Sequence, residues 1–150
     1  MEKKNIYGST DIFTSDKRSK IMANVRSKNT KPEIIVRSLL HKQGFRFRLH
    51  DTKLPGHPDI VLKKFRTVVF INGCFWHQHE ACKKATLPKQ NSTFWITKLQ
   101  RNVERDKEEK LALEKVGWKV IVVWECETKR DLSTLLSRLK QEITSSIIEA

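Results

Sequence analysis

Apolar and polar residues along the chain follow patterns that predict three helices and four strands. Apolar residues three or four positions apart, as on one face of a helix, occur at residues 30–44, 92–116 and 132–143. Strand-like alternation or short apolar runs occur at residues 45–49, 59–62, 66–71 and 118–124. The resulting order, α-β-β-β-α-β-α, predicts an α/β fold with a mixed sheet flanked by helices.

The first helix carries clear signals at both ends. Thr30 is a suitable N-cap, Pro32 stands in the first turn, and Glu33 occupies the capping-box position three residues after the cap. Gly44 ends this helix, and Gly117 ends the long second one. Between the third strand and that long helix, residues 73–90 show no periodicity and concentrate Cys, His and Trp. We expect this loop to be held by something other than a hydrophobic core.

The chain has 150 residues, which favours a single domain, and its charge points to a phosphate-bearing partner. Thirty Lys and Arg against 17 Asp and Glu give a net charge of +13. Residues 1–29 are basic and poor in apolar anchors, so we expect an arm there that follows a nucleic-acid backbone, with the folded domain at 30–150. No apolar run approaches the roughly 20 residues of a membrane span, and the N-terminus does not resemble a signal peptide. A soluble, cytoplasmic protein is therefore expected.

The three cysteines indicate a metal site rather than disulfides. Cys74 and Cys82 flank two histidines, and Cys126 follows the last predicted strand. Three thiolates and one imidazole form a tetrahedral ligand set that zinc prefers. Either His77 or His79 could complete it, and we favour His79 because its spacing from Cys82 leaves His77 free. Three unconnected cysteines in a polar loop are the alternative.

Acidic residues and one histidine suggest a site for phosphodiester hydrolysis. Asp59 follows a Pro-rich turn and begins an apolar strand, where a carboxylate can hold a hard divalent cation. His77 could accept a proton from an attacking water near neutral pH. Asp106 or Glu104 on the long helix could orient its imidazole, although both lie in a densely charged, solvated stretch. Glu33 could support the site as well as begin its helix.

Three aromatic residues are candidates for contact with DNA bases. Phe75 and Trp76 stand beside the predicted zinc site, and Trp95 lies near the start of the long helix. Apolar side chains that insert between base steps kink a duplex, which makes these residues candidate wedges. Core packing is the alternative, and it weighs about equally for Trp95, whereas we expect Phe75 and Trp76 to be exposed.

Several blocks in one order resemble the very-short-patch-repair (Vsr) DNA mismatch endonucleases. These blocks are Asp16-Lys17-Arg18-Ser19, Asn29-Thr30-Lys31-Pro32-Glu33, Leu54-Pro55-Gly56-His57-Pro58-Asp59, Asn72-Gly73-Cys74-Phe75-Trp76-His77, Phe94-Trp95, Asn102-Val103-Glu104-Arg105-Asp106 and Trp124-Glu125-Cys126. The resemblance runs from about Asp16 to Leu139, nearly the whole chain.

This resemblance implies a single-domain restriction-endonuclease-like fold of the PD-(D/E)xK superfamily. It implies Mg²⁺-dependent nicking of double-stranded DNA, 5′ to the thymine of a T:G mismatch produced by deamination of 5-methylcytosine. A functional link to a cytosine-5 DNA methyltransferase follows, and mismatch-repair proteins are candidate partners. We expect a monomer associated with the nucleoid.

The resemblance also implies roles for particular residues. Asp59 and the backbone carbonyl of Ile71 would bind Mg²⁺, His77 would be the general base, and Asp106 and Glu33 would support the site. Phe75, Trp76 and Trp95 would form the wedge at the mismatch. Structural Zn²⁺ would be bound by Cys74, His79, Cys82 and Cys126.

The chain departs from the family pattern at two places. The loop before Cys82 is one residue longer than expected, and Ile71-Asn72 stands where a Thr-His pair can occur, which removes a possible supporting histidine. The Glu-x-Lys of many nucleases is absent after the central strand, consistent with His77 taking the place of the lysine. Two other functions compete with mismatch nicking: a related nuclease for other modified or branched DNA, and a non-catalytic zinc-stabilised nucleic-acid-binding module.

Overall fold

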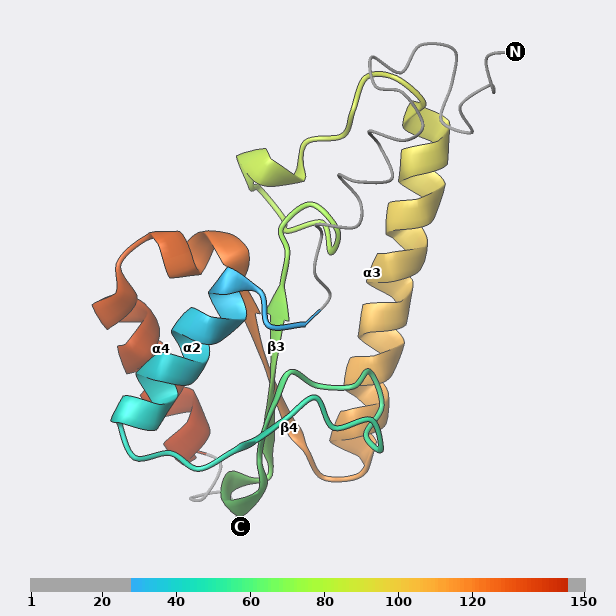
Figure 1. The fold of residues 1–150 in the computed structure, drawn as a ribbon. Helices are drawn as coiled ribbons and strands as arrows, with labels where there is room; N and C mark the ends of the chain where they lie inside the picture. Colours follow the sequence, from blue (N-terminus) through green and yellow to red (C-terminus); the bar gives the residue numbers. More distant parts are fainter. Residues whose placement is uncertain (1–27, 146–150) are drawn as a thin grey trace.

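The computed structural model describes residues 28–145, which form one sheet with helices on both faces (Figure 1). In chain order the elements are α2 (Lys31–Lys42), β1 (Arg48–Leu49), β2 (Ile60–Leu62), β3 (Thr67–Asn72), α3 (Ser92–Lys115), β4 (Lys119–Trp124) and α4 (Leu132–Ser145). The predicted order of helices and strands is confirmed. Residues 1–27 of the expected basic arm lie outside the described part of the chain. Within residues 28–145, no helix combines the length and the apolar character that crossing a membrane requires.

The sheet is mixed, as predicted. Its strands lie in the order β1-β2-β3-β4, with β1–β2 and β2–β3 antiparallel and β3–β4 parallel. Parallel neighbours need a long crossover, and α3 provides it between β3 and β4. The β3–β4 register runs from Thr67 opposite Lys119 to Asn72 opposite Trp124, so both strands end at the same edge of the sheet.

Two hydrophobic layers lie on opposite faces of the sheet. Helices α2 and α4 cover one face and α3 covers the other (Figure 1). Because side chains alternate along β3, Val69 packs in the α2–α4 layer and Val68 in the α3 layer. Leu40 of α2 and Leu139 of α4 are fully buried. Truncating either to Ala would destabilise the fold by about 2–5 kcal/mol.

The first helix begins and ends as its sequence predicts. The side chain of Thr30 accepts a hydrogen bond from the Glu33 N–H at 3.4 Å. Pro32 lies in the first turn, and Gly44 follows the helix with a φ of 86°, which glycine adopts at little steric cost. Gly117, with a φ of 89°, likewise follows α3.

The first predicted strand is wrong in length. Residues 45–49 were expected to be extended and paired, but the strand comprises Arg48–Leu49 alone. The Phe45 N–H bonds instead to the Leu40 carbonyl and closes the end of α2. Phe45 and Phe47 pack against the α2–α4 layer, so their alternation reflects side-chain burial without strand pairing. Short 3-10 helices also occur: η1 (Lys63–Phe65) between β2 and β3, η2 (Lys83–Ala85) within the Cys-rich loop and η3 (Glu125–Lys129) after β4.

Candidate functional site

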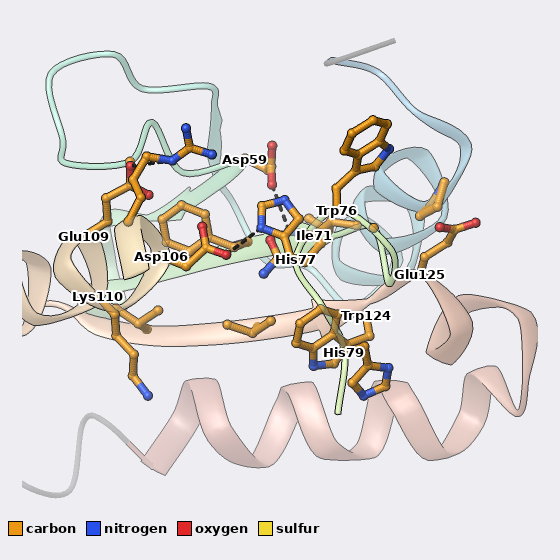
Figure 2. A pocket seen from close by; sticks show the side chains of 18 of the residues that line it. Asp59, Ile71, Trp76, His77, His79, Asp106, Glu109, Lys110, Trp124 and Glu125 are labelled. Carbon is orange, nitrogen blue, oxygen red and sulfur yellow. Dashed lines mark hydrogen bonds and ion pairs between the residues drawn. The ribbon is translucent and has the colours of Figure 1, made fainter. Parts of the chain in front are cut away.

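A cleft of about 1610 Å³ brings together the four residues expected to be catalytic. Glu33 comes from the first turn of α2, Asp59 from the residue before β2, His77 from the loop after β3, and Asp106 from the middle of α3. These four side chains are separated by up to 73 positions in sequence, yet all line the same cleft. Figure 2 shows Asp59, His77 and Asp106 there.

Asp59 is held at the cleft by a tight turn and by the central strand. The turn needs glycine at position 56, where φ is 75° and an added Cβ would lie 2.7 Å from Glu109 Oε2. The Asp59 carboxylate accepts a hydrogen bond from the Ile71 N–H at 2.8 Å through Oδ2. Burial raises the pKa of the Asp59 carboxyl to about 6 and the negative charge of Glu33 acts in the same direction, while the Ile71 N–H lowers it. A carboxylate whose ionisation is disfavoured in this way gains strongly from a nearby cation.

The imidazole of His77 is paired with a carboxylate. Its Nδ1 lies 2.6 Å from Asp106 Oδ2, and the loop is shaped by a hydrogen bond from the His77 N–H to the Gly73 carbonyl. A carboxylate accepts the proton on Nδ1, so in the neutral ring Nε2 keeps its lone pair. The local pattern left Asp106 and Glu104 as alternatives and the family resemblance implied Asp106; the structure brings Asp106 to His77. Glu104 is exposed.

Glu33 combines a helix-start position with a place in the cleft. It is 2% exposed, and its Oε2 accepts from the backbone N–H of Asn29 at 3.0 Å and from Arg37 at 2.8 Å. In a capping box the Glu33 carboxylate would accept from the backbone N–H of Thr30, but here it accepts from that of Asn29. The functional and the helix-capping interpretations of Glu33 are compatible in one side chain.

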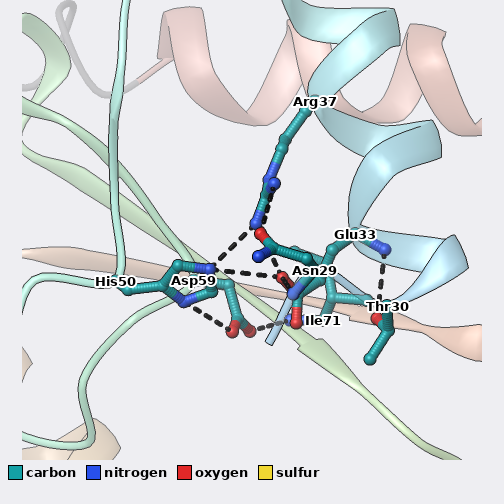
Figure 3. A network of polar contacts seen from close by, with 7 residues as sticks. All are labelled: Asn29, Thr30, Glu33, Arg37, His50, Asp59 and Ile71. Atoms are coloured by element: carbon teal, nitrogen blue, oxygen red, sulfur yellow. Dashed lines mark hydrogen bonds and ion pairs between the residues drawn. The ribbon is translucent and has the colours of Figure 1, made fainter. Parts of the chain in front are cut away.

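Two residues near Asp59 were missed from the sequence. Arg37 contacts Glu33, and His50 lies between Glu33 and Asp59 (Figure 3). Donor atoms of Glu33, His50 and Asp59 all lie within 4.8 Å of one another. Carboxylate oxygens in this arrangement fit a hard divalent cation. The i, i+4 spacing of Glu33 and Arg37 was a usable signal, whereas nothing in the local pattern marked His50.

A second cluster unites the residues expected to bind zinc. Donor atoms of Cys74, His79, Cys82 and Cys126 all lie within 4.8 Å of one another, with 3.4 Å between Cys126 Sγ and His79 Nδ1. The His79 ring stacks on Trp124 at 4.2 Å between ring centroids. The three sulfurs and one imidazole fit a tetrahedral zinc site. The choice of His79 over His77 for this cluster agrees with the structure.

The electrostatics of the cysteine cluster also favour a bound cation. Burial raises the pKa of the Cys74 thiol to about 11, whereas the Lys84 backbone N–H lowers the pKa of Cys82. A cation at the centre would stabilise all three thiolates. The loop between them has left-handed backbone at Gln78 and Ala81, with φ of 49° and 57°. Such conformations in residues other than glycine persist where the surroundings fix them.

The three aromatic candidates form one cluster, in which Trp76 also lines the cleft. Ring centroids lie 5.1 Å apart for Phe75 and Trp76, 5.4 Å for Phe75 and Trp95, and 6.0 Å for Trp76 and Trp95. All three side chains are half-buried, so Phe75 and Trp76 are less exposed than expected. The Lys98 ammonium lies 5.7 Å from the Trp76 ring centroid and adds positive charge beside it.

Comparison with known proteins places this cleft in one family. The family model for DNA mismatch endonuclease Vsr matches residues 10–84, which include Asp59 and His77. The chain is 51% identical over 140 residues to the type II nicking enzyme V.NmeAIP of Neisseria meningitidis, covering 92% of this chain and 99% of that protein. The chain belongs to the Vsr family of DNA mismatch endonucleases.

Other Vsr-family relatives cover similar lengths. The type II nicking enzyme V.XorIIP of Xanthomonas oryzae is 47% identical over 137 residues, which are 91% of this chain and 99% of that protein. DNA mismatch endonuclease Vsr of Escherichia coli is 41% identical over 116 residues, or 77% of this chain and 74% of that protein. The resemblance seen in the sequence blocks is therefore confirmed as Vsr membership.

Proposed function

We propose that this Vsr-family chain nicks one strand of double-stranded DNA, 5′ to the thymine of a T:G mismatch, by Mg²⁺-dependent phosphodiester hydrolysis. The observation that carries the proposal is the His77–Asp106 pair, which lies in one cleft with Asp59. A base oriented by a carboxylate, next to a second carboxylate suited to a cation, is the arrangement that hydrolysis of a phosphodiester requires.

Asp59 and the backbone carbonyl of Ile71 are the proposed Mg²⁺ ligands, with Glu33 supporting the site. When bound, Mg²⁺ supplies positive charge that stabilises the negative charge developing on the phosphate. The Ile71 N–H fixes the Asp59 carboxylate through Oδ2, so this ligand is already oriented before a cation arrives.

His77 is the proposed general base. Its Nε2 accepts a proton from the attacking water while the water oxygen forms a bond to phosphorus. The bond between phosphorus and the leaving oxygen of the nicked strand then breaks. The carboxylate of Asp106 keeps the ring in the tautomer with a free Nε2 and stabilises the imidazolium that forms. Proton transfer of this kind contributes about 10²–10⁴-fold to a rate.

Phe75, Trp76 and Trp95 are the proposed wedge at the mismatch. Their clustered rings offer apolar edges beside the cleft, next to the cationic Lys98. Separating stacked bases costs least where the pair is mismatched, so a wedge of this kind favours a T:G site over paired DNA.

The cysteine cluster is the proposed structural zinc site. Zinc held by Cys74, His79, Cys82 and Cys126 would tie the loop after β3 to the end of β4. This loop carries His77 and two of the aromatic residues. A structural zinc would therefore stabilise the fold and keep the base and the wedge in place.

The remaining proposals concern the setting of the reaction. The fold is proposed to be restriction-endonuclease-like, and the basic arm at residues 1–29 to follow the phosphate backbone. T:G mismatches arise by deamination of 5-methylcytosine, so the chain would act where a cytosine-5 DNA methyltransferase acts. A monomer associated with the nucleoid in the cytoplasm, with mismatch-repair proteins as partners, fits this role.

A strand-resolved nicking assay tests the proposal. A T:G duplex, the paired C:G control and an EDTA blank are compared with Mg²⁺ present in the first two. A nick confined to the 5′ side of the mismatched thymine is expected. Metal-dependent cutting without mismatch preference would favour a nuclease for other modified or branched DNA, and no cutting of any DNA would favour a zinc-stabilised binding module.

A further inference from the structure

A polar network between α2 and the end of β1 contains Arg37 and His50, which take no part in the proposed chemistry. Arg37 donates through Nη2 to Glu33 Oε2 at 2.8 Å and contacts His50 Nε2 at 2.9 Å. Its Nη1 donates to the Asn29 side-chain carbonyl at 2.9 Å. Figure 3 shows the guanidinium directed at the Nε2 edge of the His50 ring, whose Nδ1 edge is directed toward the Asp59 carboxylate.

The contact with Arg37 favours one tautomer of the neutral His50 ring. His50 Nε2 lies 2.9 Å from Arg37 Nη2 and 3.5 Å from Glu33 Oε2. A guanidinium has donors and no acceptor, so the shorter contact is a hydrogen bond when Nε2 accepts with its lone pair. The neutral ring then carries its proton on Nδ1, which lies 3.8 Å from Asp59 Oδ1. The contact is longer than a hydrogen bond but is electrostatically favourable, because a proton on Nδ1 carries positive partial charge close to a carboxylate.

His50 is held rigidly enough to act on Asp59. Its backbone N–H donates to the Asp59 carbonyl at 3.2 Å, and its left-handed φ of 48° turns the side chain out of the short β1 strand. The side chain is 16% exposed. Ile71 holds one carboxylate oxygen of Asp59 and His50 faces the other, so the plane of the carboxylate is defined from two sides.

Arg37 also controls the charge around Asp59. Glu33 is buried, and its donor atom lies within 4.8 Å of the Asp59 carboxylate. Without the positive charge of the Arg37 guanidinium, the carboxylates of Glu33 and Asp59 would face each other with no compensating charge from Arg37. Within the described residues, Arg37 Nε is itself buried without a hydrogen-bond partner, which costs solvation. An arginine kept against that cost beside Glu33 and His50, which line the cleft, suits a functional role better than a purely structural one.

We propose that Arg37 and His50 are positioning residues that orient the Asp59 carboxylate for binding of the catalytic divalent cation. The inference rests on the proposed metal-dependent nicking, because it assigns Asp59 as the cation ligand. Arg37 selects the Nδ1–H form of His50 and neutralises Glu33, and His50 directs its N–H toward Asp59. The alternative is an ordinary i, i+4 ion pair at the start of α2, with His50 as a packing residue.

Nitrogen NMR of the imidazole tests the first half of the proposal without metal or DNA. Neutral histidine in water favours the Nε2–H form, so a His50 ring in the Nδ1–H form is a specific expectation. Arg37→Gln should return His50 toward the Nε2–H form. Wild-type protein with His50 in the Nε2–H form would overturn the proposal.

Cation binding tests the second half. Mn²⁺ binding followed by electron paramagnetic resonance, and the Mg²⁺ concentration for half-maximal nicking, are measured for wild type, His50→Leu and His50→Gln. His50→Leu should weaken both by about 10-fold, the lower range for loss of a group that orients a metal ligand. His50→Gln should lie close to wild type, since its amide can accept from Arg37 and donate toward Asp59. His41→Leu, an exposed histidine on α2, is the matched control.

The two failures are distinguishable. A wild-type protein that binds Mn²⁺ but cuts no DNA would contradict the proposed function, while the Mn²⁺ comparison would still decide the roles of Arg37 and His50. Equal Mn²⁺ affinity in wild type and a folded His50→Leu variant would overturn the positioning role. Thermal unfolding checks folding, and His50→Asn, whose shorter amide cannot reach both partners, replaces His50→Leu if that variant is unfolded.

Discussion

The Nδ1 atom of His77 lies 2.6 Å from Oδ2 of Asp106, although the two residues are 29 positions apart. One residue sits in the loop after β3 and the other on α3, the crossover helix that covers the opposite side of the cleft. The parallel pairing of β3 and β4 requires this crossover, so the topology of the sheet brings the carboxylate to the imidazole.

Replacing Asp106 with Asn should lower kcat for nicking by about 10²-fold or more, within the range for loss of a positioned general base. The Asn amide can donate to Nδ1 and so place the proton on Nε2, where it blocks the base. Single-turnover nicking measures the effect, and DNA affinity in EDTA should be unchanged. Glu104→Gln, two residues earlier on α3 and exposed, is the matched control. A similar loss in both variants would contradict the pairing of Asp106 with His77.

Replacing Asp59 with Asn should abolish Mg²⁺-dependent nicking while raising stability at neutral pH. The pKa of Asp59 is raised in the folded state to about 6 from 3.8, so the folded protein binds this proton more tightly than the unfolded chain does. At pH 7 the ionised carboxylate therefore destabilises the fold, and Asn should add about 1–3 kcal/mol. That gain should shrink as the pH falls from about 6 toward 4. Denaturant unfolding across this pH range checks the sign, and a variant less stable than wild type at pH 7 would refute the argument.

Purified protein should contain about one zinc per chain, the number that one four-ligand site holds. Cys126→Ser should lower the melting temperature and reduce zinc content, since the loop would lose a ligand that joins it to the end of β4. Metal analysis and thermal unfolding with and without a chelator provide the measurement. Glu80→Gln, an exposed change in the same loop, should leave both unchanged. Zinc-free protein of unaltered stability would count against the cluster as a metal site.

Trp76→Ala should weaken discrimination between T:G and C:G duplexes more than it weakens binding to paired DNA. Stacking of a base on an aromatic ring is worth about 1–3 kcal/mol, whereas phosphate contacts would be unaffected. Competition binding of the two duplexes in EDTA gives the comparison. Ile96→Ala removes an exposed apolar side chain from α3 close to the cluster and serves as the control. Equal losses on both duplexes would assign Trp76 to packing.

Local sequence was a good guide wherever the signal lay within one element. The capping residue Thr30, the glycines after α2 and α3 and the apolar run of β3 were read from the local sequence alone, and the structure agrees. The strand over residues 45–49 was predicted too long because two half-buried phenylalanines at alternate positions imitate a paired strand. Burial of side chains and pairing of backbone are separate properties, and the first was read as the second.

The sequence by itself indicated the order of elements, the mixed sheet, Glu33, Asp59 and His77 as candidate site residues, and the cysteine cluster. These follow from periodicity, turn chemistry and ligand type, which are local properties of the chain. Local pattern could not decide between Glu104 and Asp106, although the family resemblance implied Asp106. The two residues point about 200° apart on one helix, and the docking of α3 brings Asp106 to His77. The places of Arg37 and His50 beside Asp59 were likewise set by packing of α2 against the sheet, because no spacing along the chain encodes a contact between separate elements.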